Sequence, residues 1–261
     1  MAGPEADDSD GVLVVATTLV VPPEEHRQLE SLLAPDERLR AERMVAGVRE
    51  RFVVGRARLR LVLGRLLETP PEELEFRSGR WGKPDLACAA PRPLHFNLTH
   101  SGNRGLVALC RGQPVGIDLE FHTAAFTPEW AARMAASILA ADERAAWRLL
   151  AEPDRPRALL DTWVVKEAVF KALGCGLAGG LTRLSLPCDR RRLRETLAGA
   201  SPIQLSATLG GAEPATTLSA RLIDVGGDAH AALATIGPPT RVTFSSFETF
   251  MAGGGEPAAD A

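Results

Sequence analysis

A nine-residue segment, Trp163 to Lys171, constrains this chain more than any other stretch. It reads W-V-V-K-E-A-V-F-K, and most of its residues are apolar, as expected for a helix that packs against a core. Trp163, Glu167 and Lys171 recur at i, i+4 and i+8, so they would share one face of such a helix. A buried carboxylate needs a partner, and Lys171 lies one turn away. The segment predicts a half-buried helix that carries either a structural ion pair or part of a charged site.

Lysine is used sparingly. The chain has 30 Lys plus Arg residues, yet only Lys83, Lys166 and Lys171 are lysines. A planar guanidinium does not reproduce the compact charge of an ammonium group. All three lysines fall in segments that other features single out, which favours a specific role for each ammonium group.

Bulk properties limit the class of protein. With 261 residues, the chain can form one large domain or two small ones with a real core. A net charge of −3 gives no reason to expect a nucleic-acid partner. No apolar run approaches the roughly 20 residues that span a bilayer. The N-terminus is acidic and does not resemble a secretory signal. The four cysteines form no C-x-x-C pair, so they do not suggest a disulfide framework or a zinc site. We expect a cytoplasmic protein with no membrane partner.

Hydrophobic periodicity predicts an α+β fold. Apolar residues follow helical spacing in some segments and alternate in others. Helices are expected across 24–33, 36–48, 50–67, 127–150 and the segment around 163–171. Strands are expected at 11–21, 94–101, 105–110, 115–121, 181–186, 203–209, 218–225 and 229–236. Disordered tails are expected at 1–10 and 251–261, with an N-terminal α+β half at 11–121 and a C-terminal α+β half at 122–250.

Two segments recur in the same order. The sequence L-A-P-D-E-R at 33–38 resembles L-A-A-D-E-R at 139–144, and 52–60 aligns with 163–171. Chance similarity between alanine-rich helices is one explanation. The other is a chain of two similar halves with a seam near Phe121, in which case the site lies between the halves.

Carboxylates point to a cation site. Asp118 and Glu120 alternate along a predicted strand and share one face, and Glu167 could supply a third oxygen. Carboxylates without neighbouring His or Cys suit Mg²⁺ rather than zinc, and Mg²⁺ often keeps positions for phosphates. Arg56 falls on the apolar stripe of its helix, which indicates either a snorkelling side chain or an anion site. The candidate cations for phosphate are Arg51, Arg56, His100 and Lys171.

Three ordered motifs resemble those of the 4′-phosphopantetheinyl transferase superfamily, surfactin-synthetase-activating type. The resemblance is clear from about residue 35 to 186. The motifs are G-K-P at 82–84 with F-N-L-T-H-S at 96–101, V-G-I-D-L-E at 115–120, and W-V-V-K-E-A-V-F-K at 163–171 with G-C-G-L at 174–177.

The resemblance implies a monomer of two similar α+β halves related by pseudo-two-fold symmetry, with the active site in the cleft between them. Its activity would be Mg²⁺-dependent transfer of 4′-phosphopantetheine from coenzyme A to a serine of an apo acyl, polyketide or peptidyl carrier protein. Adenosine 3′,5′-bisphosphate would be released, and Mn²⁺ could replace Mg²⁺. The sequence does not identify the client carriers.

The family pattern also implies residue roles. Asp118, Glu120 and Glu167 would bind the metal. Glu167 would also be the general base, directly or through a metal-bound water, and Lys171 would contact the coenzyme A phosphates. The remaining cofactor contacts implied are Lys83 and Pro84 at the adenine, Arg51 and His100 at the 3′-phosphate, Arg56 at a phosphate, and Thr99, which stands where the family usually has serine.

Two other functions compete with this one. A coenzyme A-binding or carrier-binding protein without catalysis would keep the cleft, but the intact carboxylates and Lys171 argue against it. A Mg²⁺-dependent phosphodiesterase or nuclease would use the same carboxylates. The missing basic stripe and the G-K-P segment disfavour that function.

Overall fold

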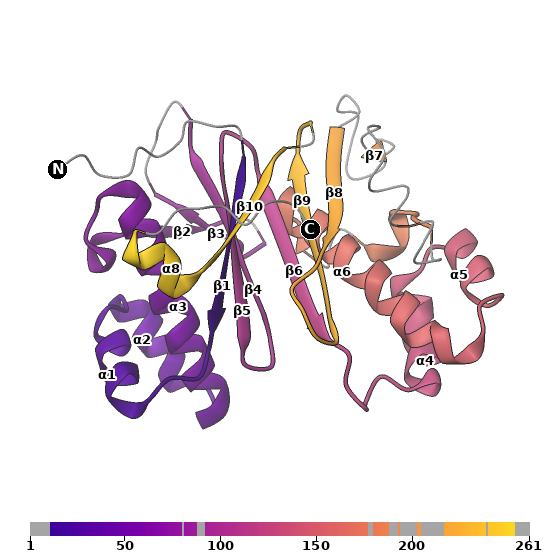
Figure 1. Ribbon diagram of the computed structural model, residues 1–261, viewed down its shortest axis with the longest axis horizontal. Helices are drawn as coiled ribbons and strands as arrows, with labels where there is room; N and C mark the ends of the chain where they lie inside the picture. The colour runs from indigo at the N-terminus through magenta and orange to yellow at the C-terminus, as the bar shows by residue number, and fades with distance from the viewer. Residues whose placement is uncertain are drawn as a thin grey trace.

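The computed structural model describes residues 11–79, 81–87, 92–176, 180–187, 193, 203–204, 217–238 and 240–253. Helices gather at the two ends of the molecule, and two four-stranded sheets lie between them (Figure 1). The predicted α+β fold class is confirmed. The pseudo-two-fold relation between the halves stays a prediction.

The first sheet is built mainly from the N-terminal part of the chain. Its strand order is β10-β1-β5-β4, in which β10 is parallel to β1 and the other neighbours are antiparallel. The long helix α3 packs on its outer face through Leu59, Val62 and Leu63. The strands are β1 (Val12–Thr18), β4 (Leu94–Ser101), β5 (Arg104–Arg111) and β10 (Val242–Ser246), and the helices beside them are α1 (Pro23–Ser31), α2 (Pro35–Glu42) and α3 (Ala46–Leu67).

The second sheet has the order β6-β9-β8-β7, with antiparallel neighbours throughout. The long helix α6 packs across β6 and β9 on the outer face of this sheet. The strands are β6 (Val115–Phe121), β7 (Ile203–Gln204), β8 (Thr217–Ile223) and β9 (Ala229–Ile236), and the helices are α4 (Pro128–Ile138), α5 (Ala141–Trp147) and α6 (Arg155–Leu173).

Shorter elements complete the described chain. Strands β2 and β3 form a separate hairpin beside the first sheet. These elements are β2 (Phe76–Ser78), β3 (Pro84–Leu86), the 3₁₀ turns η1 (Pro71–Glu73), η2 (Glu152–Asp154) and η4 (Leu181–Arg183), and the C-terminal helix α8 (Phe247–Ala252).

Several predicted boundaries differ from the structure. The helix expected across 36–48 is divided, because α2 ends at Glu42 and α3 begins at Ala46. The strand expected at 181–186 does not form: residues 181–183 are the turn η4, and residues 184–186 are irregular. Helix α8 continues through Ala252, past the predicted start of the tail. Residues 1–10, 205–209 and 254–261, and Leu177 of the G-C-G-L segment, lie outside the described residues.

Two strands, β6 and β10, belong to a sheet whose other strands come from the other half of the sequence. β6 closes the predicted N-terminal half, yet it pairs with β9 of the second sheet. β10 lies near the C-terminal end, yet it pairs with β1 of the first sheet. Alternating hydrophobicity identifies a strand and its buried face, but it leaves the choice of partner strand to tertiary packing. The chain therefore crosses between the two sheets twice, once into β6 and once into β10.

The inner faces of the two sheets share an apolar core. Val115, Ile117 and Leu119 of β6 face this core and contact residues of the first sheet. Because successive side chains of a strand point to opposite faces, Asp118 and Glu120 project to the other side, which α6 covers. The sheet-on-sheet core thus fixes the direction of both carboxylates.

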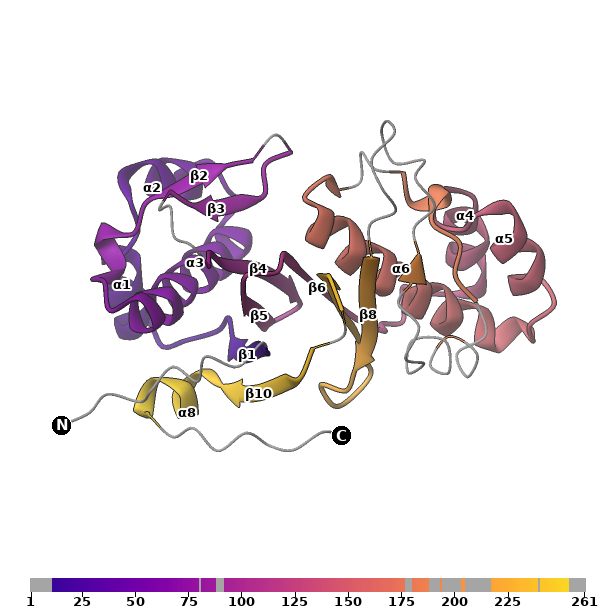
Figure 2. The same ribbon diagram turned by 90° about the horizontal axis from the view of Figure 1, so that it is seen from above.

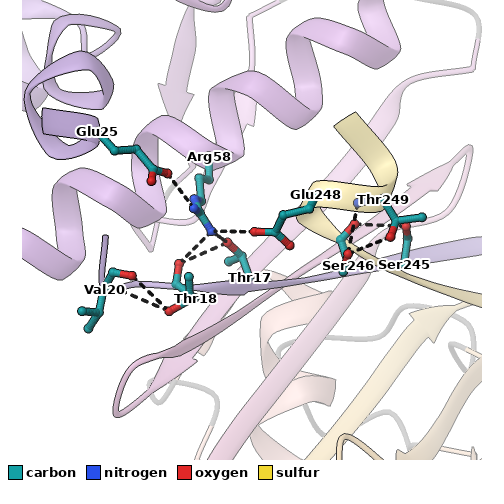
Figure 3. Close-up of polar contacts among 9 residues, drawn as sticks. All are labelled: Thr17, Thr18, Val20, Glu25, Arg58, Ser245, Ser246, Glu248 and Thr249. Carbon is teal, nitrogen blue, oxygen red and sulfur yellow. Dashed lines mark hydrogen bonds and ion pairs between the residues drawn. The ribbon is translucent and has the colours of Figure 1, made fainter. Parts of the chain in front are cut away.

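Arg58 of α3 fastens the C-terminal helix α8 to the first half. Its guanidinium donates to Thr17 Oγ1 at 2.7 Å and pairs with Glu25 at 2.8 Å (Figure 3). It also lies 4.5 Å from the centre of the Phe247 ring and 3.6 Å from Glu248 Oε1. One buried cation thus joins β1, α1, α3 and α8.

The structure also bears on membrane association. Among the helices of the described ranges, none combines the length and the apolarity that crossing a bilayer requires.

Candidate active site

Polar side chains of β4 join the two sheets at the seam beside β6. Asn97 Oδ1 accepts from the Ile117 amide at 2.9 Å, and Thr99 Oγ1 donates to Asp118 Oδ1 at 3.1 Å. Ser101 Oγ donates to Glu120 Oε2 at 3.0 Å. These three residues alternate along β4 and so share one face of the strand. The N-L-T-H-S part of the motif therefore orients the two carboxylates of β6.

Lys171 contacts the centre of this group from α6. Its Nζ lies 2.5 Å from Asp118 Oδ1 and 3.3 Å from both Thr99 Oγ1 and the Ile117 carbonyl oxygen. The lysine side chain is 25% exposed, whereas that of Asp118 is 7% exposed. The acid and base of the ion pair thus come from different elements, and the partner of Lys171 is Asp118 rather than Glu167 one turn before it.

Asp118 retains one unsatisfied oxygen. Its Oδ2 is buried and has no hydrogen-bond partner in the described part of the protein. An unsatisfied buried oxygen on a carboxylate is costly, and each such group needs an explanation. A ligand bound beside Asp118 would satisfy it.

The other two carboxylates lie close enough to influence one another. Burial raises the pKa of Glu167, and the charges of Asp118 and Glu120 raise it further, against the effect of Lys171. Burial likewise raises the pKa of Glu120, opposed by its hydrogen bond from Ser101. Crowded carboxylates are favoured when a cation lies between them. The charges of Asp118 and Glu120 therefore both act on Glu167, although no group of three such side chains in the described ranges is positioned to hold a metal ion.

A second charged region surrounds His100 at the end of β4. Burial lowers the pKa of His100, and the positive charges of Arg51 and Lys171 lower it further. Arg51 forms no ion pair with any described residue. Basic groups that converge without an anion favour the binding of one.

Arg56 is engaged inside the protein. Its Nε lies 2.8 Å from Glu37 Oε1, and its guanidinium lies 4.7 Å from the centre of the Phe76 ring. Burial lowers the pKa of Arg56, and the charge of Glu37 opposes this effect. These contacts explain why an arginine occupies the apolar stripe, and its contact with phosphate stays a prediction.

The G-K-P segment lies at the β2–β3 hairpin. Pro84 begins β3 and pairs with Ser78. The Lys83 ammonium is directed into the protein, where Nζ donates to the carbonyl oxygens of Val115 at 2.9 Å and Lys171 at 2.7 Å. The predicted contact of these residues with adenine is not tested by this geometry.

Some polar residues of the site were not predicted. The sequence indicates Asn97 and Ser101 only as parts of a motif, although their alternation with Thr99 along one strand is a signal for a shared face. None of the three motifs includes His230 of β9, whose Nδ1 lies 2.7 Å from Asp161 Oδ1 of α6, and both side chains are buried. Only the pairing of β9 with β6 brings this contact beside Glu120.

Comparison with known proteins gives the family. The family model described as the 4′-phosphopantetheinyl transferase superfamily matches residues 114–219. The 4′-phosphopantetheinyl transferase HetI of Nostoc is 33% identical over 172 residues, which cover 65% of this chain and 71% of the relative. A Synechocystis protein, whose name assigns it provisionally to the same activity, is 33% identical over 156 residues, which cover 59% of this chain and 62% of that protein.

More distant relatives carry related names. A phosphopantetheinyl transferase of Thraustochytrium is 28% identical over 179 residues, which cover 62% of this chain and 59% of the relative. The 4′-phosphopantetheinyl transferase gsp of Aneurinibacillus migulanus is 28% identical over 127 residues and 49% of each chain. By the extent of these matches, the chain belongs to the 4′-phosphopantetheinyl transferase superfamily.

Proposed function

We propose that this protein transfers 4′-phosphopantetheine from coenzyme A to a serine hydroxyl of an apo carrier protein. The observation that carries the proposal is the buried, unpartnered Oδ2 of Asp118, in a group that also holds Glu120, Glu167 and Lys171. The family membership supports the reaction type.

The donor set fits a hard divalent cation. Asp118, Glu120 and Glu167 would hold Mg²⁺, or Mn²⁺ in its place, because carboxylate oxygens are the ligands that such ions prefer. The unsatisfied oxygen of Asp118 and the raised pKa values of the two glutamates are both relieved by a cation. When bound, the ion would neutralise charge on the pyrophosphate of coenzyme A.

The protein's own residues account for the remaining chemistry. The carrier serine oxygen attacks the β-phosphorus of coenzyme A, a new P–O bond forms, and the bond to the bridging oxygen breaks, which releases adenosine 3′,5′-bisphosphate. Glu167 accepts the serine proton as the general base. Lys171 stabilises phosphate charge, while Arg51 and His100 hold the 3′-phosphate in the region of convergent positive charge.

The test is the intact mass of apo carrier proteins incubated with the enzyme, coenzyme A and Mg²⁺. The panel contains fatty-acid, polyketide and nonribosomal-peptide carriers. We expect a mass gain of one phosphopantetheine on at least one carrier, and we expect EDTA to abolish it. Transfer that persists in EDTA would contradict the metal assignment. Binding of coenzyme A without transfer to any carrier would favour the non-catalytic alternative.

A further inference from the structure

The ammonium group of Lys83 lies between the two elements that carry the site. Its Nζ donates to the carbonyl oxygen of Val115, the first residue of β6, and to that of Lys171 in the last turn of α6. Lys171 is also the residue whose side chain reaches Asp118. Figure 2 shows the tip of the β2–β3 hairpin reaching toward this end of α6. One side chain from a distant hairpin thus holds the backbone of both elements.

The end of α6 is suited to such a contact. The last carbonyl groups of a helix lack partners within the helix and carry partial negative charge, which a cation stabilises. Gly174 ends α6 with a positive φ of 71°, and a β-carbon at this position would lie 3.9 Å from Lys83 Cδ. The lysine therefore packs its stem on the turn and places its charge at the helix terminus.

Gly116 brings α6 into direct contact with β6. A β-carbon at this position would lie 2.1 Å from the Ala168 carbonyl oxygen and 2.3 Å from the Ala172 amide nitrogen. The helix backbone thus rests on the strand backbone with no side chain between them. Because Lys171 lies on α6 and Asp118 lies on β6, a displacement of α6 relative to β6 changes the distance between these two side chains.

We infer that Lys83 is a positioning residue of the transferase site. It fixes the C-terminal end of α6 against the start of β6, so that Lys171 meets Asp118 between the two elements. This inference rests on the proposed function. It differs from a contact with the adenine, because the Lys83 ammonium is directed at two protein carbonyl oxygens.

The variant Lys83→Met keeps a stem of similar length and removes the donors. Misplacement of a catalytic group by about 1 Å can lower the rate roughly a hundredfold. We therefore expect the kcat of Lys83→Met, normalised to the concentration of protein that binds coenzyme A, to fall by about 30-fold or more. The Kd for coenzyme A should change by less than about threefold, since the phosphate-binding residues remain. The matched control is Arg77→Met, which removes an exposed cation from the same hairpin and should leave both constants unchanged.

A second readout does not depend on turnover. Hydrogen exchange in peptides that cover residues 170–176 should speed up in Lys83→Met, because the Gly174 amide bonds to the carbonyl oxygen that Lys83 holds. Gly116→Ala, provided that it still binds coenzyme A, should lower kcat in the same way as Lys83→Met.

The outcomes separate the two proposals. If Lys83→Met binds coenzyme A more weakly but keeps its kcat, Lys83 is a cofactor contact and the positioning role is wrong. The positioning role is also wrong if both kcat and the exchange rate of residues 170–176 stay unchanged in this variant. If the wild-type protein transfers nothing to any carrier, the proposed function fails. The hydrogen-exchange measurement then still decides whether Lys83 stabilises the end of α6. Unchanged exchange in Lys83→Met would show that it does not.

Discussion

The two long helices α3 and α6 each pair with a buried glutamate of the short helix before them, which we call the anchor of the long helix. The two helices differ in what their other charged residues contact. Each follows a short helix whose third residue is a glutamate that accepts from the backbone amide at the start of that helix, Glu37 to Ala34 and Glu143 to Ala140. Both glutamates are almost fully buried. The repeated L-A-x-D-E-R sequence thus forms the same local structure twice.

The cations that neutralise the two glutamates differ. Glu37 pairs with Arg60 at 2.7 Å and with Arg56 at 2.8 Å, so two arginines of α3 are turned inward. Glu143 pairs with Lys166 of α6, its one cation among the described contacts. Lys166 also donates to two backbone carbonyl oxygens. A single lysine thus completes the anchor in the second half, which leaves its neighbour Glu167 for the site.

The two helices also differ in whether their charged side chains are available for chemistry. Arg56 aligns with Glu167 in the repeat, yet Arg56 faces a buried carboxylate, whereas Glu167 belongs to the carboxylate group around Asp118. The scarce lysines follow the same division of roles. Lys166 anchors α6, Lys83 holds its end, and Lys171 contacts Asp118.

The largest effect should come from Asp118, whose carboxylate contacts Lys171 and raises the pKa of Glu167. We expect Asp118→Ala to lower the transfer rate by about 10⁴-fold, equivalent to about 5.4 kcal/mol at 1.36 kcal/mol per tenfold. The fold should persist, because Lys171 is partly exposed and can be hydrated. Intact-mass kinetics and circular dichroism check both parts, with the exposed Asp85→Asn as the control. Retained turnover in Asp118→Ala would contradict the metal assignment.

The two anchors can be compared directly by removing one cation from each. Lys166→Met leaves Glu143 buried without a cation and should cost about 3–5 kcal/mol of unfolding free energy. Arg56→Met leaves Glu37 paired with Arg60 and should cost about 1–2 kcal/mol. Urea denaturation measures both. Equal costs would refute the idea that Arg56 is redundant at its anchor, and the coenzyme A affinity of Arg56→Met tests its predicted phosphate contact separately.

The burial of Lys83 predicts a pH dependence. Burial lowers the pKa of Lys83 from 10.5 to about 8. Between these values the unfolded chain binds more protons at this residue than the folded protein does, so stability rises with pH across the window. Below pH 8 the full cost of charging the buried amine is present. We expect the unfolding free energy of the wild type to gain about 1–3 kcal/mol more than that of Lys83→Met between pH 7.5 and 10.5. Parallel curves would contradict the lowered pKa.

The smallest effect should come from the exposed contact at α8. Glu248 lies 3.6 Å from Arg58 and is 68% exposed, so Glu248→Gln should change the unfolding free energy by less than about 0.5 kcal/mol. Arg58→Met should cost several times more, because it removes a buried guanidinium that donates to the buried Thr17 hydroxyl of β1 and pairs with the partly exposed Glu25 of α1. A large effect of Glu248→Gln would show that the surface pair, rather than the buried contacts, holds α8.

Local pattern was sufficient for much of the fold and of the site. Alternation along 115–121 gave the strand and the shared face of Asp118 and Glu120, because side-chain direction in a strand has a fixed period. Spacing along 163–171 gave a helix that carries Glu167 and Lys171, because neighbours on a helix face recur every three to four residues. The L-A-x-D-E-R repeat indicated two similar local structures, which the buried glutamates now explain.

Which of these residues contact one another depends on the packing of α6 against β6. The i, i+4 spacing favoured a pair between Glu167 and Lys171, but the close approach of α6 to Gly116 gives Lys171 to Asp118 instead. The same approach places the end of α6 within reach of Lys83, 88 residues earlier in the chain. Sequence spacing fixes side-chain directions within one element, whereas contacts between elements depend on which strands pair and how closely the backbones pack.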